Sequence, residues 1–320
     1  MDLSDLELSQ EELFAHVDHS EAESEKITAP RYSYWKSVFR VFFRNKMNIV
    51  ILALLALVIL FSYAYPMIFP YDQNENVMTE GVKHMTPSEA MNQFGYKLKW
   101  ILGSGDIGQS TFEAVWNGAR ISVSLAFLCA AINMVIGVII GAVWGFSKKV
   151  DIFMTEVYNI IGNVPYVLVI SVMVLVFTAS FWTLVFAMTI TGWLGIAYFI
   201  RTQVIIIRDR EYNLASKCLG TSTFRIAMRN ILPFMTSVIV TLLATELPSY
   251  ISYEVFLSYI GIGMADMSLG KLIQAASRNI GIAKWSIEFW APTAVAGIIA
   301  IVLYVAGQNL GDASDPRTHR

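Results

Sequence analysis

The chain has 320 residues, of which 55% are hydrophobic and only 15% are charged, and its mean hydropathy is +0.54. This composition is too apolar for a soluble globular protein of this length and predicts an integral membrane protein. The net charge of −2 is unevenly distributed, because residues 2–25 carry nine acidic side chains and no lysine or arginine. Residues 1–31 are therefore predicted to be an acidic, solvated tail on the cytoplasmic side.

Residues 32–46 alternate aromatic and basic side chains directly before the first apolar run. This pattern fits an amphipathic helix at the cytoplasmic interface, or equally a positively charged anchor that only orients the following span. Either interpretation places the N-terminus in the cytoplasm. A first transmembrane helix is predicted over 47–69, and an external loop with one short helix continues to about residue 118.

Five further apolar runs predict five more transmembrane helices, over 119–146, 152–178, 182–200, 234–259 and 289–308. Most of the 23 lysines and arginines then fall in segments predicted to be cytoplasmic, which indicates cytoplasmic N- and C-termini. The sequence thus predicts an all-α membrane protein with six transmembrane helices. Its core would cover 119–310, and 311–320 would form a cytoplasmic tail.

A basic segment, 201–233, separates the fourth and fifth predicted spans. It contains six lysines and arginines, and each would cost about 2.5–3.5 kcal/mol at the bilayer centre, so the segment cannot lie in lipid. Tyr212, Ala215 and Leu219 recur at helical spacing, and Gly220 supplies a C-terminal stop. We expect a short, amphipathic, basic helix in the cytoplasm to which a soluble partner can bind.

A second short helix is predicted to begin near Phe224 in the same segment. Thr221 or Ser222 can cap it, since both have the short hydroxyl side chains that helix N-caps favour.

The fifth predicted span carries acidic residues on one broad face. Glu246, Tyr250, Tyr253 and Glu254 share this face, and Thr245 extends a polar side toward the cytoplasm. Ionisable groups within a span normally face a bundle interior or a watery cavity, so these residues are predicted to line a solute path. The alternative is that Glu246 is neutralised by a buried donor and that Glu254 lies near the outer interface.

Signatures of catalysis or metal binding are missing from the sequence. It contains neither a phosphate-binding loop nor the His-Glu-x-x-His or Gly-x-Ser-x-Gly patterns. His16 and His19 could share a helical face, but a solvated tail is the simpler interpretation, and Cys129 and Cys218 are not expected to form a disulfide. We therefore expect no catalytic residue, metal site or cofactor on this chain.

Three asparagines within the predicted spans have a structural interpretation. Asn133, Asn159 and Asn163 are predicted to form hydrogen bonds between helices.

Twelve residues between 193 and 233 follow a distinctive order and spacing. They are Trp193, Ala197, Arg201, Arg208, Arg210, Glu211, Tyr212, Ala215, Gly220, Ile231, Leu232 and Pro233. This pattern resembles the EAA loop of ABC importer permeases, specifically those of the dipeptide and oligopeptide importer family. Leu214 and Ser216 depart from the family pattern, and the external motif at 103–110 is degraded.

Short motifs elsewhere are similar to those of the second, C-type permease subunit of that family. They lie at 44–46, 118–122, 257–263 and 309–316, and the resemblance covers about 34–317. It implies a type I ABC importer permease fold in a prokaryotic cytoplasmic membrane. Expected partners are a homologous permease, two cytoplasmic ATPases that hold ATP and magnesium, and an extracellular peptide-binding protein.

The resemblance assigns a mechanical role to the basic helix, which would couple the ATPases to the path. The residues implied in this coupling are Arg208, Arg210, Glu211, Tyr212, Ala215, Lys217, Leu219 and Gly220. The expected cargo is a short peptide. Nickel or another small solute carried by the same architecture stays open as an alternative, as does a secondary transporter driven by an ion gradient.

Overall fold

The computed structural model describes residues 34–71, 82–282 and 286–315. The predicted acidic tail, with His16 and His19, and the last five residues lie outside the described residues. Residues from Val38 onward form one compact unit. In the described part of the chain, regular structure is helical apart from an isolated bridge between Ser104 and Ser110. The predicted all-α fold class is confirmed.

Two helices open the described chain, α2 (Tyr34–Arg44) and α3 (Lys46–Ile68). They are separated by Asn45, whose side chain caps α3 by accepting the Met47 N–H at 3.0 Å. Helix α2 buries Val38 and Phe42, and the aromatic rings on its other side are exposed. Helix formation in this basic, aromatic segment is as predicted, and its position at the membrane interface stays a prediction.

The region predicted to be external contains the short helix expected there, α4 (Pro87–Phe94), and a 3₁₀ turn, η4 (Leu98–Trp100). The long helix α5 (Thr111–Phe146) begins eight residues before the predicted start of the second span. Ser110 explains the early start, because its hydroxyl caps the helix by accepting the Glu113 N–H at 3.2 Å. The predicted boundary at residue 118 therefore falls inside α5.

The third predicted span is broken into α6 (Lys148–Gly162) and α7 (Tyr166–Val176), which are bent by 72° relative to each other. Pro165 lies in the break and has an extended ψ of 123°. Proline has no N–H to continue a helix and disfavours helical geometry in the residue before it. The span predicted over 152–178 is therefore interrupted at this point.

The fourth predicted span consists of α8 (Phe181–Ile190) and α9 (Trp193–Arg208), joined at Thr191 and Gly192. Helix α9 continues eight residues beyond the predicted end of the span. The basic segment is therefore shorter than predicted, and it contains α10 (Glu211–Cys218), α11 (Thr223–Ile226) and the π-helical turn η5 (Ala227–Ile231).

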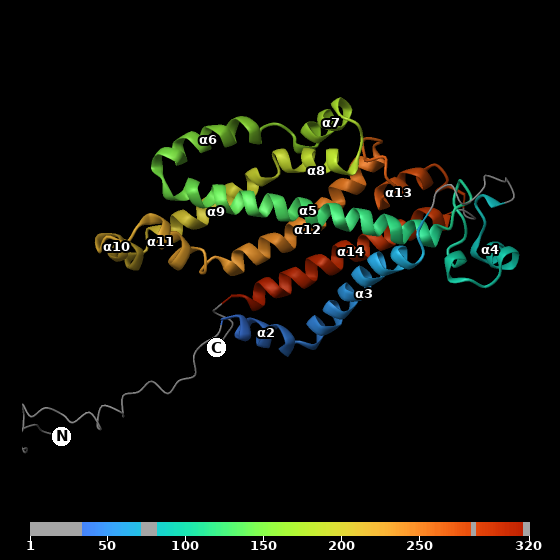
Figure 1. Ribbon diagram of the computed structural model, residues 1–320, viewed down its shortest axis with the longest axis horizontal. Coiled ribbons are helices and arrows are strands. Elements are labelled where there is room, and N and C mark those ends of the chain that lie inside the picture. Colours follow the sequence, from blue (N-terminus) through green and yellow to red (C-terminus); the bar gives the residue numbers. More distant parts are fainter. Residues whose placement is uncertain (1–33, 72–81, 283–285, 316–320) are drawn as a thin grey trace, which may run out of the picture. The chain divides into compact units, whose positions relative to one another are not determined.

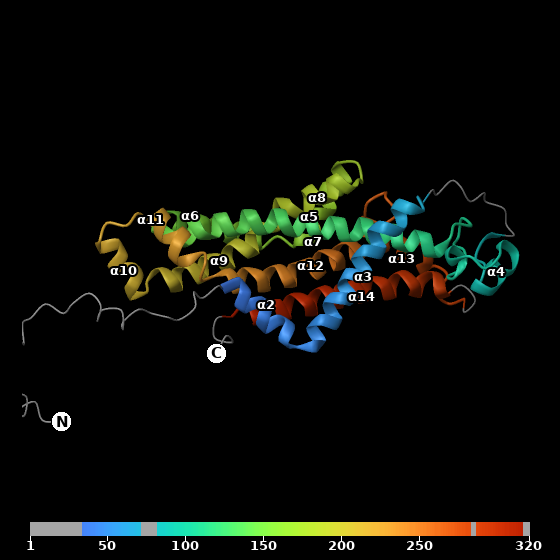
Figure 2. The same ribbon diagram turned by 60° about the horizontal axis from the view of Figure 1, so that its bottom comes forward.

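Three helices complete the unit, α12 (Thr236–Tyr259), α13 (Leu269–Ser277) and α14 (Ser286–Ala313). Helix α5 packs along α9 on one side and α12 on another, and α12 also packs along α14. Figures 1 and 2 place α10 and α11 at one end of this bundle and α4 and α13 at the other. Helix α13 was not predicted, because its nine residues are too few for a span and lie in a stretch that also contains Gly261, Gly263 and Gly281.

Four of the described helices are long and apolar enough to cross a membrane: α3, α5, the continuous α8–α9 segment and α14. The bent α6–α7 pair makes a fifth if it counts as one span. Helix α12 has 24 residues, long enough to cross at about 1.5 Å per residue. Its two glutamates and many hydroxyl side chains lower its hydropathy, so it is not among the helices that are apolar enough to cross. The predicted sixth crossing therefore stays a prediction.

Small residues allow α5 and α9 to approach closely. Gly137, Gly141 and Gly145 recur every fourth residue of α5 and face α9. A Cβ atom added at Gly141 would lie 2.8 Å from the Cβ of Ile200, well inside normal contact distance. Close backbone approach of this kind is how helices associate strongly within membranes.

Replacing Gly141 with valine is expected to destabilise the α5–α9 contact. Because the added methyl groups must push the helices apart, we expect a loss of about 1–3 kcal/mol of stability. A lower melting temperature of the detergent-purified protein would show it. The control is Gly297→Ala on α14, where an added Cβ would meet nothing within 4 Å; equal melting temperatures for the two variants would contradict this account.

Candidate functional site

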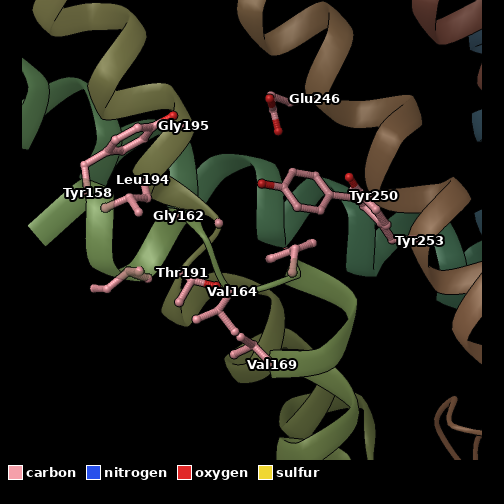
Figure 3. A pocket seen from close by; sticks show the side chains of 13 residues that line it. Tyr158, Gly162, Val164, Val169, Thr191, Leu194, Gly195, Glu246, Tyr250 and Tyr253 are labelled. Carbon is pink, nitrogen blue, oxygen red and sulfur yellow. The ribbon is translucent and has the colours of Figure 1, made fainter.

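A cavity of about 280 Å³ lies where the break between α6 and α7 faces the α8–α9 junction and α12. Its lining is Tyr158, Ile161, Gly162, Val164, Tyr166, Val169, Thr191, Gly192, Leu194, Gly195, Glu246, Tyr250 and Tyr253. Figure 3 shows residues of the α6–α7 break on one side of this cavity and Glu246, Tyr250 and Tyr253 on α12 on the other. The cavity is our candidate site for the transported solute.

Irregular backbone at two places makes room for this cavity. The 163–165 break and the 191–192 junction both interrupt apolar helices. In a membrane such interruptions are tolerated only where the backbone is buried in protein or lines a watery space. Gly192 also allows a close approach, since a Cβ there would lie 2.6 Å from the Asn133 amide nitrogen.

Three of the predicted path residues meet in this cavity: Glu246, Tyr250 and Tyr253. Tyr250 is almost fully buried, and Asn133 donates a hydrogen bond of 2.6 Å to its hydroxyl. Asn133 also donates to the carbonyl of Met188, at 3.2 Å, so its predicted role between helices is confirmed.

Asn159 and Asn163 behave differently from Asn133. Both are exposed, and the Asn163 side chain donates to the Asn159 carbonyl one turn earlier in the same segment. The predicted hydrogen bonds between helices are therefore not what the structure shows for these two residues. Their position beside the helix break explains the local bond.

Thr245 faces a different space from Glu246. It lines a second cavity of about 520 Å³, together with Ser237 and Thr241 on α12 and Asp312 and Asp315 near the C-terminal end of the described chain. Successive residues of a helix point about 100° apart, which explains why neighbours on α12 serve different cavities.

Glu254 lies in neither cavity, although the sequence pattern predicts it on the path. Its side chain is fully buried, and its carboxylate accepts hydrogen bonds from the hydroxyls of Ser122 at 2.7 Å, Ser258 at 3.0 Å and Ser268 at 2.5 Å. The three serines belong to α5, α12 and the N-cap of α13. Glu254 therefore connects three helices as a buried side chain, and its predicted place on the solute path stays a prediction.

Helix α10 ends as the sequence predicts. Gly220 adopts a positive φ of 81°, its N–H bonds to the Lys217 carbonyl at 3.0 Å, and the Thr221 N–H bonds to the Ser216 carbonyl at 3.0 Å. This pair of bonds is a Schellman motif, which favours glycine at the left-handed position. Ser222 is the cap of the following helix, with its hydroxyl 3.4 Å from the Arg225 nitrogen.

The apolar row of α10 is exposed in this single chain. Tyr212 is 48% exposed and Leu219 is 86% exposed, and Ala215 is exposed between them. Arg210, Glu211 and Lys217 are exposed as well. All predicted coupling residues of α10 are therefore accessible to a partner.

Arg208 fixes the junction of α9 and α10. Its guanidinium donates to the Gly145 carbonyl at the end of α5, at 2.6 Å, and to the carboxylate of Asp209, at 2.8 Å. The same guanidinium lowers the pKa of the exposed Asp209 carboxyl below its ordinary value. Arg208 thus makes contacts within this chain. Its predicted contact with a partner is limited to the part of the side chain that stays exposed.

Two sets of contacts made by the basic segment were not predicted from the sequence. Asn213 is 2% exposed, donates to the Ile207 carbonyl at 2.9 Å and accepts from the Asn230 amide at 2.9 Å. Arg201 pairs with Asp151 on α6. The only sequence signal for Asn213 is its position on the face of α10 opposite to the apolar row. A polar residue on such a face is too common to identify a structural role.

Metal chemistry has no support in the described residues, since they contain no group of three or more His, Cys, Asp and Glu side chains arranged to hold a metal ion.

Comparison with known proteins gives matches over nearly the whole chain. Residues 133–320 match the family described as the binding-protein-dependent transport system inner membrane component. Residues 33–87 match the N-terminal TM domain of oligopeptide transport permease C. Both matches agree with the family resemblance that the sequence motifs indicate.

Individual relatives give the same result. The chain is 44% identical to the oligopeptide transport system permease protein AmiD of Streptococcus pneumoniae, over 97% of this chain and 98% of that protein. It is 32% identical to the oligopeptide transport system permease protein OppC of Bacillus subtilis, over 96% and 98% of the two chains. The dipeptide transport system permease protein DppC of the same organism is 29% identical, over 97% and 94%.

A solved structure supports the fold. An inward-facing structure of the MetNI methionine ABC transporter has a TM-score of 0.50 and 16% identity, over 63% of this chain and 96% of the compared chain. At this identity the likeness concerns the fold alone.

Replacing Asn213 with alanine is expected to loosen α10. Because the Asn230 amide and the Ile207 carbonyl would lose their partner, we expect a local loss of about 1–3 kcal/mol. Hydrogen exchange of 211–218 should accelerate while α12 stays unchanged. Ser216→Ala is the control, since its hydroxyl bonds only within α10; equal exchange in both variants would contradict the role of Asn213.

Replacing Glu254 with glutamine is expected to destabilise the whole bundle. The amide group would bring donors toward serine hydroxyls that now donate, at a cost of about 1–3 kcal/mol for a buried mismatch. The measurement is thermal unfolding in detergent. Ser252→Ala on the exposed side of α12 is the matched control. Equal melting temperatures for Glu254→Gln and Ser252→Ala would refute the connector role.

Proposed function

The chain belongs to the family of binding-protein-dependent transport system inner membrane components, and from this premise we propose that it is the C-type permease subunit of an ATP-driven importer of short peptides. The names of its relatives refer to oligopeptides and dipeptides, which supports the peptide as cargo. The subunit would form half of the translocation path and is not itself an enzyme.

The continuity of helix α9 is the observation that carries this proposal. Leu194 and Gly195, in its first turn, line the cavity, and Arg208 at its other end joins it to the exposed helix α10. A force applied to α10 is therefore transmitted to the cavity along one helix of 16 residues. Rigid helices that move between two packed arrangements are an established way of transmitting such a change.

The proposed partners follow from this arrangement. Two cytoplasmic ATPases, which hold ATP and magnesium, would bind α10 of this subunit and the corresponding helix of a homologous permease. Tyr212, Ala215 and Leu219 would supply apolar contact, and Arg210 and Lys217 would form the polar rim. An extracellular binding protein would deliver the peptide on the opposite side, and both termini of this chain would be cytoplasmic.

A bulky residue in the α10 contact is expected to abolish transport. Ala215→Trp should leave the protein in the membrane and reduce the rate of ATP-driven peptide uptake more than tenfold. The reason is that a large ring cannot enter a contact shaped for a methyl group. Uptake into proteoliposomes containing the complete transporter is the measurement. Ala215→Ser, which adds a single oxygen, should retain uptake.

Two results would overturn the proposal. Normal uptake by Ala215→Trp would show that α10 is not the coupling contact. Uptake that survives ATP depletion and falls when the ion gradient collapses would identify a secondary transporter instead, and competition by nickel but not by peptides would identify a different cargo.

A further inference from the structure

The candidate cavity contains a single charged side chain, Glu246, surrounded by tyrosines. Tyr158, Tyr166, Tyr250 and Tyr253 line the same space, and its lining includes no lysine, arginine or histidine. Figure 3 shows Glu246 and Tyr250 projecting from α12 toward the α6–α7 break. A carboxylate among aromatic rings is suited to an organic cation, since the carboxylate supplies the counter-charge and the ring faces attract an ammonium group.

The Glu246 carboxylate has no cationic partner among the described residues. Ion pairs there involve the carboxylates of Asp151, Asp209 and Glu288 instead. Glu254, two turns further along α12, has its carboxylate occupied by three serine hydroxyls. A carboxylate partly withdrawn from bulk water is stabilised by a nearby positive charge, so Glu246 is suited to serve as counter-ion to a cation from outside the chain.

We propose that this cavity binds the ammonium group of a peptide in transit, with Glu246 as the counter-ion and the tyrosines as the walls. The inference rests on the proposed function, which supplies the peptide. A free peptide carries an α-ammonium group at neutral pH, and a lysine side chain carries the same chemistry. The cavity of about 280 Å³ is below the range of roughly 300–1,000 Å³ for sites that enclose a drug-sized ligand, so it fits one end of a peptide better than a whole oligopeptide.

An inorganic cation fits the site less well. Calcium requires about six to eight oxygen ligands and magnesium about six. The cavity offers one carboxylate, and its tyrosine hydroxyls are partly committed, since Tyr166 donates to the Met188 carbonyl at 2.7 Å and Tyr250 accepts from Asn133 at 2.6 Å. Ring faces, by contrast, are what an ammonium group with apolar neighbours prefers.

Equilibrium dialysis of the complete transporter in nanodiscs, without the binding protein, tests this inference. The probes are tetra-alanine, N-acetyl-tetra-alanine, and N-acetyl-tetra-alanine with one alanine replaced by lysine. Wild-type transporter should bind tetra-alanine about tenfold more tightly than its acetylated form, as expected for loss of one charge-assisted hydrogen bond. The lysine probe separates the two sources of ammonium, because it should recover binding only if a side-chain ammonium also reaches the site.

Substitutions at the cavity give the decisive comparison. Glu246→Gln should bring the affinities for free and acetylated tetra-alanine to the same value, and Glu246→Asp should retain part of the difference. Ser249→Ala, one turn away and bonded only to the Thr245 carbonyl, should leave the difference at its wild-type size. If Glu246→Gln fails to assemble, Tyr158→Leu carries the test, since removing a ring from the wall should reduce the same difference.

Equal binding of free and acetylated peptide by the wild type, or an unchanged difference in Glu246→Gln, would overturn the inference. Both results are independent of the proposed function, which is judged by ATP-driven peptide uptake in the presence of the binding protein. A transporter that imports peptides and yet shows no effect of Glu246→Gln would retain its function and lose this site.

Discussion

The constraint on which this structure depends is that backbone polar groups need partners throughout the apolar layer. Helices meet this need internally, and a break in a helix does not. The breaks at 163–165 and 191–192 are therefore confined to one place, where they face α12 across a cavity. Placing both interruptions together gives the bundle a polar region at this cavity and leaves the rest of each helix free to pack against apolar neighbours.

The packing of α5 against α9 links that region to the end of the bundle that carries α10. Glycines at every fourth position bring the two helices into direct backbone contact, and Arg208 ties the end of α9 to the Gly145 carbonyl of α5. Close packing of this kind opposes independent movement of the two helices, because packed interiors do not deform continuously. The exposed row of α10 is attached to the pair through Asn213 and its two hydrogen bonds.

Local sequence signals predicted local structure well. The stop at Gly220, the cap at Ser222 and the helical character of 34–44 each depend on neighbouring residues, and each is found in the structure. The connector at Glu254 could not be predicted, because its partners Ser122 and Ser268 are distant in sequence and serine hydroxyls carry no pattern. The sequence pattern therefore did not distinguish Glu254, which is buried among serines, from Glu246 on the same helix, which reaches the cavity.

Helices α7 and α8 have 11 and 10 residues, about half of what a bilayer crossing requires. Alone, each is too short to bridge the hydrocarbon layer, and α8 reaches crossing length only through its continuation into α9. They pack against each other as a hairpin and are continued by α6 on one side and α9 on the other. The hairpin therefore depends on α6 and α9 for its depth in the bilayer, and a truncation after α8 would leave both of its arms too short to span.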